Sequence, residues 1–64
     1  MTDYSTLIKK LRARMLLSQQ EFSEILGVSF ATVNRWENGH HSPTYKARRK
    51  IASLCKKYHI DIEE

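Results

Sequence analysis

The sequence is poor in cysteine, glycine and proline. It contains one cysteine, Cys55, with two glycines and one proline. A single cysteine excludes an internal disulfide, and so few glycines and prolines disfavour a sheet with many tight turns. No apolar run approaches the ~20 residues of a membrane span, and the N-terminus has no apolar signal region. We therefore expect a cytoplasmic, helical protein that has no contact with a membrane.

Residue sets for catalysis or metal binding are also missing. No Ser/His/Asp or Cys/His arrangement occurs at usable positions, and there is no glycine-rich phosphate loop. His40 and His41 are adjacent, whereas Cys55 and His59 are distant from them, and this spacing is unlike that of structural zinc sites. A chain of 64 residues leaves little room for a deep pocket beside its core. The sequence therefore predicts no enzyme, metal, cofactor or small-molecule ligand.

Positive charge is concentrated in the second half of a chain whose formal net charge is +4. The segment from Arg35 to Lys57 contains a single acid, Glu37. Its basic residues are Arg35, Lys46, Arg48, Arg49, Lys50, Lys56 and Lys57. Such clustering attracts polyanions and releases counterions from nucleic acid. Charge alone does not separate this interpretation from an ordinary solvated helix face.

Apolar residues at helical spacing, together with capping residues, predict four helices. These helices span about 4–15, 18–26, 29–38 and 44–58. The expected N-caps, whose side chains accept backbone N–H groups, are Asp3, Ser18, Ser29 and Thr44. Ser18 and Glu21 have the spacing of a capping box, and Gly27 and Gly39 suit left-handed helix ends. Segment 60–64 is predicted to begin a fifth helix, with Asp61 and Glu64 at capping-box spacing.

The apolar faces of these helices predict one small core. Its expected members are Tyr4, Leu7, Ile8, Leu11, Met15, Phe22, Ile25, Leu26, Val28, Val33, Trp36, Ala47, Ile51, Leu54 and Tyr58. Cys55 is expected at the edge of this core as a small apolar residue. The sequence therefore predicts an all-α fold, a single domain over residues 1–64 made of four to five short helices.

The segment from Gln19 to Asn38 is the most informative part of the chain. Its two predicted helices are separated only by Gly27, Val28 and Ser29, and so short a connection forces them to cross steeply. The small side chain of Ser23 suits the close approach that such a crossing needs. The outer face of the second of these helices is then exposed, and it carries Phe30, Ala31, Asn34 and Arg35.

Three sequence features together resemble the Cro/phage-repressor, or XRE-like, type of helix-turn-helix. They are the run LSQQEFSEILGVS from Leu17 to Ser29, the run TVNRWENG from Thr32 to Gly39, and Pro43. The similarity extends from about Leu7 to Ile62. The resemblance implies a lambda-repressor-like bundle and a bacterial or phage transcriptional regulator at the nucleoid. It would bind double-stranded DNA with its recognition helix, about 29–38, in the major groove and without a cofactor.

The resemblance also implies which side chains approach the bases, namely Phe30, Ala31, Asn34 and Arg35. The arginine fork matches O6 and N7 of guanine, and an asparagine amide matches N6 and N7 of adenine. Phe30 and Ala31 are apolar where many relatives have glutamine or serine, so they can contact only thymine methyl groups or sugars. Specificity is therefore expected to depend mainly on Arg35 and Asn34.

Phosphate contacts are expected on both sides of the recognition helix. The resemblance implies Gln19 and Asn38, and we add Ser29, His40 and Lys46 because they lie near helix ends or in the adjoining loop. Arg12 and Glu37 match a pair that, in related repressors, joins the first helix to the end of the third. We expect the same ion pair here.

Two alternative functions stay open at this stage. The chain can be a protein-interaction module on the same fold, coactivator-like or antitoxin-like, and an exposed Phe30 favours this. It can also be the targeting domain of a larger enzyme, because it can be the N-terminal part of a longer chain. Relatives commonly dimerise through further C-terminal regions, so a homodimer formed through regions absent here is a third expectation. The basic segment from Arg35 to Lys57 favours DNA binding over protein binding.

Overall fold

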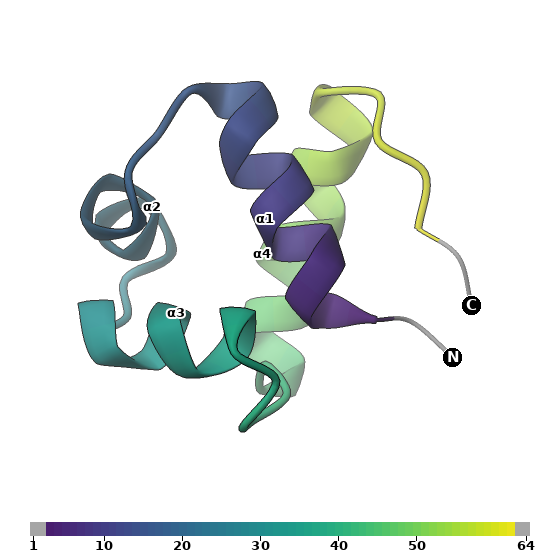
Figure 1. The fold of residues 1–64 in the computed structure, drawn as a ribbon. Coiled ribbons are helices and arrows are strands. Elements are labelled where there is room, and N and C mark those ends of the chain that lie inside the picture. Colours follow the sequence, from purple (N-terminus) through teal and green to yellow (C-terminus); the bar gives the residue numbers. More distant parts are fainter. Residues whose placement is uncertain (1–2, 63–64) are drawn as a thin grey trace.

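The computed structural model describes residues 3–62, and within that range it contains four helices and no strand (Figure 1). The helices are α1 (Tyr4–Met15), α2 (Gln19–Leu26), α3 (Phe30–Glu37) and α4 (Tyr45–Lys57). The predicted all-α fold is confirmed. None of the helices in this described part is long and apolar enough to cross a membrane.

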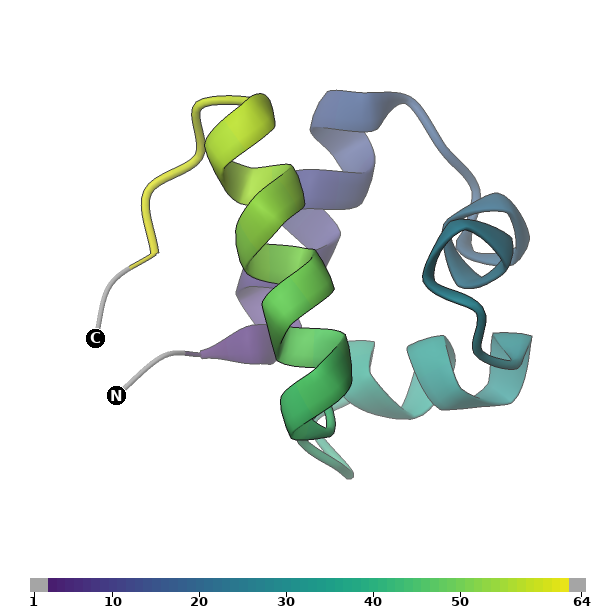
Figure 2. The ribbon, with the colours of Figure 1, turned by 180° about the vertical axis from the view of Figure 1, so that it is seen from behind.

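The four helices form a bundle in which α3 packs against both α1 and α2. α1 packs against α4 and against α3, while α2 packs against α3. Figures 1 and 2, seen from opposite sides, show α3 lying across one end of α1 and α4, with α2 on the same side of α3, over the part that extends past them. The first and last residues that the structure describes, 3 and 62, lie on the side away from α2.

Each helix begins at the predicted N-cap. The side chains of Asp3, Ser18, Ser29 and Thr44 accept hydrogen bonds from backbone N–H groups three residues on. At α2 the full capping box is present, because Glu21 also accepts from the Ser18 backbone N–H at 3.0 Å. That bond, with the bond between the side chains, lowers the pKa of Glu21. An N-cap of this kind typically contributes ~1 kcal/mol to stability.

The helix ends were only partly predicted. Gly27 and Gly39 adopt left-handed conformations, with φ of 72° and 77°, as expected after α2 and α3. α1, in contrast, ends on Leu16, which has a φ of 59° and is 89% exposed. A residue with a Cβ atom adopts this conformation at a cost. Leu16 is thus an exposed, conformationally strained position that the sequence did not indicate.

The core lies where the four helices meet. Its buried apolar side chains are Leu7, Ile8, Leu11, Phe22, Leu26, Val33, Trp36, Ala47, Ile51, Cys55 and Ile60. Tyr4, Met15, Val28, Leu54 and Tyr58 pack against this cluster while partly exposed. Two predictions were wrong. Ile25 is 50% exposed, because the inner face of α2 buries Phe22, Ser23 and Leu26 instead. Cys55 is fully buried within the core and not at its edge.

The predicted fifth helix is absent from the described residues. The chain turns at His59, whose φ is 58°, and Ile60 then packs into the core with 7% exposure. Residues 60–62 are irregular. Burial of Ile60 fixes this segment against the bundle, which replaces the helical start expected there. The expected cap between Asp61 and Glu64 involves a residue outside the described range.

Candidate nucleic-acid interface

α2 and α3 form a tight helix-turn-helix unit. Ser23 is buried, with 1% exposure, and its backbone carbonyl accepts the Val28 N–H at 3.0 Å. Gly27 donates to the Glu24 carbonyl at 3.2 Å and supplies the left-handed turn. The small side chain of Ser23 lets the connecting segment lie close to α2. As predicted, the short connection makes α3 cross α2 steeply (Figure 1).

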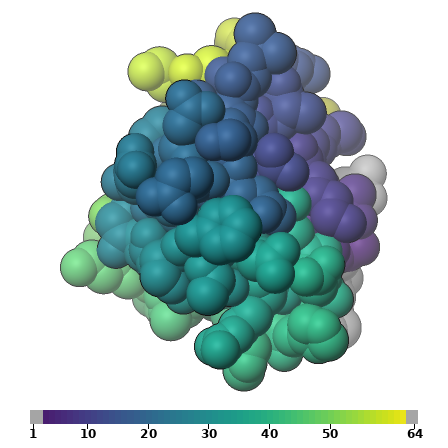
Figure 3. All heavy atoms as spheres, turned by 60° about the vertical axis from the view of Figure 1, so that its left-hand side comes forward, coloured from purple at the N-terminus to yellow at the C-terminus, as the bar shows by residue number. Residues whose placement is uncertain are grey.

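α3 has one buried face and one exposed face. Val33, Trp36 and Glu37 point into the molecule. The opposite face carries Phe30, Ala31 and Arg35, which are exposed, and Asn34, which is half-buried at its edge. Figure 3 shows this side of the molecule, where α2 (blue) and α3 (teal) reach the surface together. The four predicted base-contacting residues therefore lie along one accessible side of the helix.

Arg12 of α1 and Glu37 of α3 form the predicted ion pair. Arg12 Nε donates to Glu37 Oε2 at 2.9 Å, and Nη2 donates to Oε1 at 3.0 Å. A further bond from Arg12 Nη1 reaches the Leu17 carbonyl at 3.1 Å. Burial raises the pKa of Glu37, but the hydrogen bonds from Arg12 and Gln19 outweigh it, so that the net pKa is lowered. The same pair raises the pKa of Arg12. Glu37 is therefore a buried, ionised carboxylate.

Gln19, at the first position of α2, is part of the same network. Its Nε2 donates to Glu37 Oε1 at 3.2 Å and to Asn34 Oδ1 at 3.4 Å. A side-chain amide carries two N–H donors, and both are used by these acceptors. The backbone N–H of Gln19 lies in the first helical turn, where it has no acceptor within the helix. A phosphate contact from Gln19 is therefore available from its backbone and not from its side-chain nitrogen.

The other predicted phosphate contacts lie near the two ends of α3. Ser29 caps its start, and Asn38 stands at its C-cap position. His40 is exposed and donates its backbone N–H to the Arg35 carbonyl at 3.0 Å. Lys46, near the start of α4, borders a shallow depression beside Gly27. These residues surround the exposed face of α3 on more than one side.

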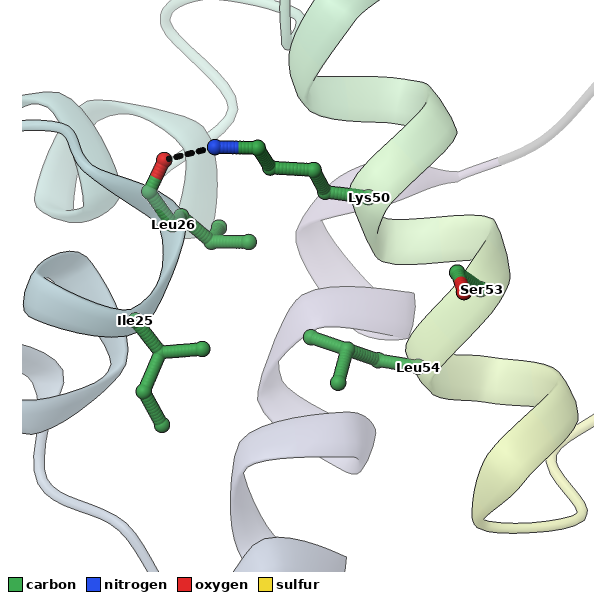
Figure 4. Close-up of a pocket in the computed structure, with 5 residues that line it drawn as sticks. All are labelled: Ile25, Leu26, Lys50, Ser53 and Leu54. Carbon is green, nitrogen blue, oxygen red and sulfur yellow. Dashed lines mark hydrogen bonds between the residues drawn. The ribbon is translucent and has the colours of Figure 1, made fainter.

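Lys50 makes a contact that the sequence did not predict. Its Nζ donates to the Leu26 carbonyl at 3.2 Å, across a groove between α2 and α4 (Figure 4). A lysine at this point satisfies a carbonyl at the helix C-terminus and suits the helix dipole. The groove is also lined by Ile25, Ser53 and Leu54, and the exposed side chain of Ile25 forms part of its wall. Lys50 and Leu26 are 24 positions apart, so no local pattern indicates the pair.

The remaining nucleophile and ligand candidates are not assembled into a site. Burial raises the pKa of the Cys55 thiol, which keeps it protonated and unreactive. Among residues 3–62, no group of three histidine, cysteine or acidic side chains is placed to hold a metal ion.

Comparisons with known proteins agree with this geometry. The family model described as "Helix-turn-helix" matches residues 8–62. A curated relative from Methanothermobacter thermautotrophicus is 34% identical over 56 residues, which cover 88% of this chain and 81% of the relative. That relative is named an uncharacterized HTH-type transcriptional regulator. No solved structure matches the chain at a significant level.

Proposed function

The chain belongs to the helix-turn-helix family of XRE type, and we propose that it is a transcriptional regulator that binds double-stranded DNA in a sequence-specific manner. α3 would enter the major groove, and α2 would lie above it against the backbone. The single observation that carries this proposal is the exposed face of α3 with Ala31 and Arg35 at its centre, backed by buried Val33, Trp36 and Glu37.

The dimensions of α3 suit this role. It has eight residues, and an α-helix with its side chains is about 10–12 Å in diameter. The major groove is about 12 Å wide and admits a helix. Because α3 is anchored to α1 through Glu37 and to α2 through Gln19, it meets DNA as a rigid element.

Within the groove, Arg35 is the residue best suited to read a base. Its side chain is exposed, and no acid among residues 3–62 forms a salt bridge with it. Its guanidinium fork can therefore reach O6 and N7 of guanine. Phe30, which is 47% exposed, and Ala31 present only apolar surface, which suits thymine methyl groups or sugars.

Phosphates are proposed to be held from both sides of α3. The backbone N–H of Gln19 at the start of α2 would bind one strand. Ser29, which caps the start of α3, and Lys46, beside the turn between α2 and α3, are proposed as further phosphate contacts. Asn38 and His40 would bind the other strand after α3 ends. Because such contacts release counterions, affinity falls as salt rises.

The proposal is tested by selecting binding sites from random duplex DNA and then measuring affinity by fluorescence anisotropy at several salt concentrations. We expect a motif with a guanine at the position that Arg35 reaches. Arg35→Ala should weaken binding to the selected site by roughly 10-fold or more, and binding to scrambled DNA much less. Arg49→Ala is the matched control, because Arg49 is an exposed arginine on α4 with the same charge.

Equal weakening on both DNAs would make Arg35 a phosphate contact and overturn its assigned role. A two-fold repeat in the selected motif, with half-sites about 10 base pairs apart, would indicate that the protein binds as a dimer. Failure of the wild-type protein to bind any duplex at low salt would overturn the proposed function. The exposed Phe30 would then favour a protein-binding role for the same face.

A further inference from the structure

We infer that Gln19 fixes the side-chain amide of Asn34 so that Asn34 reads DNA as a hydrogen-bond donor, through Nδ2. This inference rests on the proposed function. It adds a specificity that the residue type alone does not give, because an unrestrained asparagine can present either amide group. The basis is a chain of hydrogen bonds that starts at Arg12 and ends at the exposed face of α3.

The chain of hydrogen bonds begins with a group whose hydrogen-bonding character is fixed. Glu37 is 3% exposed and is paired through both of its oxygens with Arg12. That pairing holds the pKa of Glu37 below its usual value despite burial, so that the carboxylate is ionised at neutral pH. An ionised carboxylate can only accept hydrogen bonds. Any amide group that faces it must therefore be an N–H donor.

The carboxylate in turn orients Gln19. The Gln19 atom that lies 3.2 Å from Glu37 Oε1 is Nε2, and the reverse orientation would place its carbonyl oxygen against a negative charge. The same Nε2 lies 3.4 Å from the Asn34 amide, so the second N–H of Gln19 needs an acceptor there. Oδ1 of Asn34 supplies it. Arg12 of α1 therefore keeps Glu37 ionised, and Glu37 orients Gln19. Gln19 in turn orients the amide of Asn34.

Asn34 consequently has one amide group committed and one available. Oδ1 faces α2 and accepts from Gln19, whereas Nδ2 has no acceptor among residues 3–62. Asn34 is half-buried and lies three and four positions after Ala31 and Phe30, on the side of the exposed face nearest to α2. A bidentate contact with adenine N6 and N7 would have to share Oδ1 between two donors. The Nδ2 donor needs no such sharing.

A donor in the major groove is accepted best where no amino group of the base competes with it. Adenine does offer the acceptor N7, but its N6 amino group lies beside that acceptor. Guanine and thymine present the carbonyl acceptors O6 and O4 at the position where adenine and cytosine present amino groups. Asn34 should therefore favour guanine or thymine at the base it contacts. This preference differs from the adenine contact expected for an unrestrained asparagine.

The test is random-duplex selection with the wild-type protein and four variants, with base preference compared at one position of the selected site. Asn34→Ala identifies that position, because the preference there should be lost while the others remain. The wild-type protein should select guanine or thymine there. Asn34→Asp, which keeps an acceptor toward Gln19 and replaces Nδ2 by an oxygen, should shift the preference to cytosine or adenine.

Gln19→Met removes the donor that orients Asn34 while keeping a side chain of similar length. Adenine should then gain at least severalfold against guanine and thymine at the same position. Gln20→Met is the matched control, because Gln20 is the next residue of α2, is exposed, and its side chain bonds only Glu24 among residues 3–62. It should leave the base preference unchanged, and circular dichroism confirms that both methionine variants are folded.

Two results would overturn the inference while leaving the proposed function intact. One is adenine at the Asn34 position with the wild-type protein, and the other is an unchanged preference in Gln19→Met. A wild-type protein that binds no duplex DNA would instead overturn the proposed function, and the inference with it. A uniform loss of affinity in Gln19→Met, with no change of base preference, would give Gln19 a structural role only.

Discussion

Arg12 and Glu37 are joined by two parallel hydrogen bonds, of 2.9 and 3.0 Å, that tie α1 to the last turn of α3. The Ser5 hydroxyl of α1 also donates to the backbone carbonyl of Glu37. Two side chains of α1 therefore hydrogen-bond to the last residue of α3. The glutamate is almost fully buried, whereas the arginine side chain is 26% exposed. The pair therefore fixes where α3 ends, and with it the direction of the exposed face.

Removing the charge of Glu37 should destabilise the fold. In Glu37→Gln, one oxygen becomes an N–H donor that faces Arg12 or Gln19, and we expect a loss of ~2 kcal/mol in the free energy of unfolding. Urea denaturation followed by circular dichroism measures it. The double variant Arg12→Met/Glu37→Met should be more stable than the single variant, because it leaves no charge without its partner. A single variant as stable as the wild-type protein would contradict this account of the pair.

Stability should fall in acid partly because of Glu37. Its pKa in the folded protein is lowered, so its contribution is complete above the usual glutamate pKa of about 4.3 and is lost as the pH falls through the lower folded value. The wild-type protein should therefore lose more stability than Arg12→Met/Glu37→Met between pH 5 and roughly pH 3. The pKa values of Asp3 and Glu21 are also lowered, but both residues are present in the two proteins, so their effects cancel. Parallel curves against pH would contradict the assignment.

Leu16 offers a route to a more stable protein. Its φ of 59° is unfavourable for a residue with a Cβ atom, and its exposed side chain contributes little to the core. Leu16→Gly should raise the free energy of unfolding by ~1 kcal/mol, or the melting temperature by about 4–8 °C. Leu16→Ala is the control, because it shortens the side chain but keeps the strain, and it should change stability little. Equal effects of the two substitutions would mean that the backbone is not the cause.

Two neighbouring residues of α2 should differ sharply in how much stability is lost when each is replaced by alanine. Leu26 is 3% exposed and Ile25 is 50% exposed, although both were expected to face inward. Leu26→Ala should cost about 2–5 kcal/mol through lost burial and a cavity. Ile25→Ala should cost less than about 1.5 kcal/mol, since its side chain lines only the open groove of Figure 4. Thermal or urea unfolding of the two variants compares them directly, and similar losses would place Ile25 in the core after all.

Local signals predicted most of the fold, and the failures have physical causes. N-caps such as Ser18 and the turn at Gly27 depend on neighbouring residues, so the sequence displays them directly. Ile25 was misplaced because an eight-residue helix with three buried positions does not define its inner face sharply. The left-handed Leu16 was missed because leucine carries no signal for that conformation.

Of the candidate site, the sequence predicted the residues but not their connections. The ion pair of Arg12 and Glu37 was recognisable only through the family resemblance. The bonds from Gln19 to Asn34 and from Lys50 to Leu26 join helices through tertiary packing, over 15 and 24 positions. Base and phosphate contacts stay predictions, because they depend on a partner as well as on the chain.

The most direct measurement of the central claim is DNA affinity after a negative charge is placed at the centre of the exposed face of α3. Ala31→Glu does this, and Ala13→Glu adds the same charge at an exposed alanine of α1. Fluorescence anisotropy with the selected duplex should show affinity reduced by two orders of magnitude or more for Ala31→Glu, while Ala13→Glu stays within a few fold of the wild-type protein. Equal affinities for the two variants would contradict the claim that α3 is the surface that binds DNA.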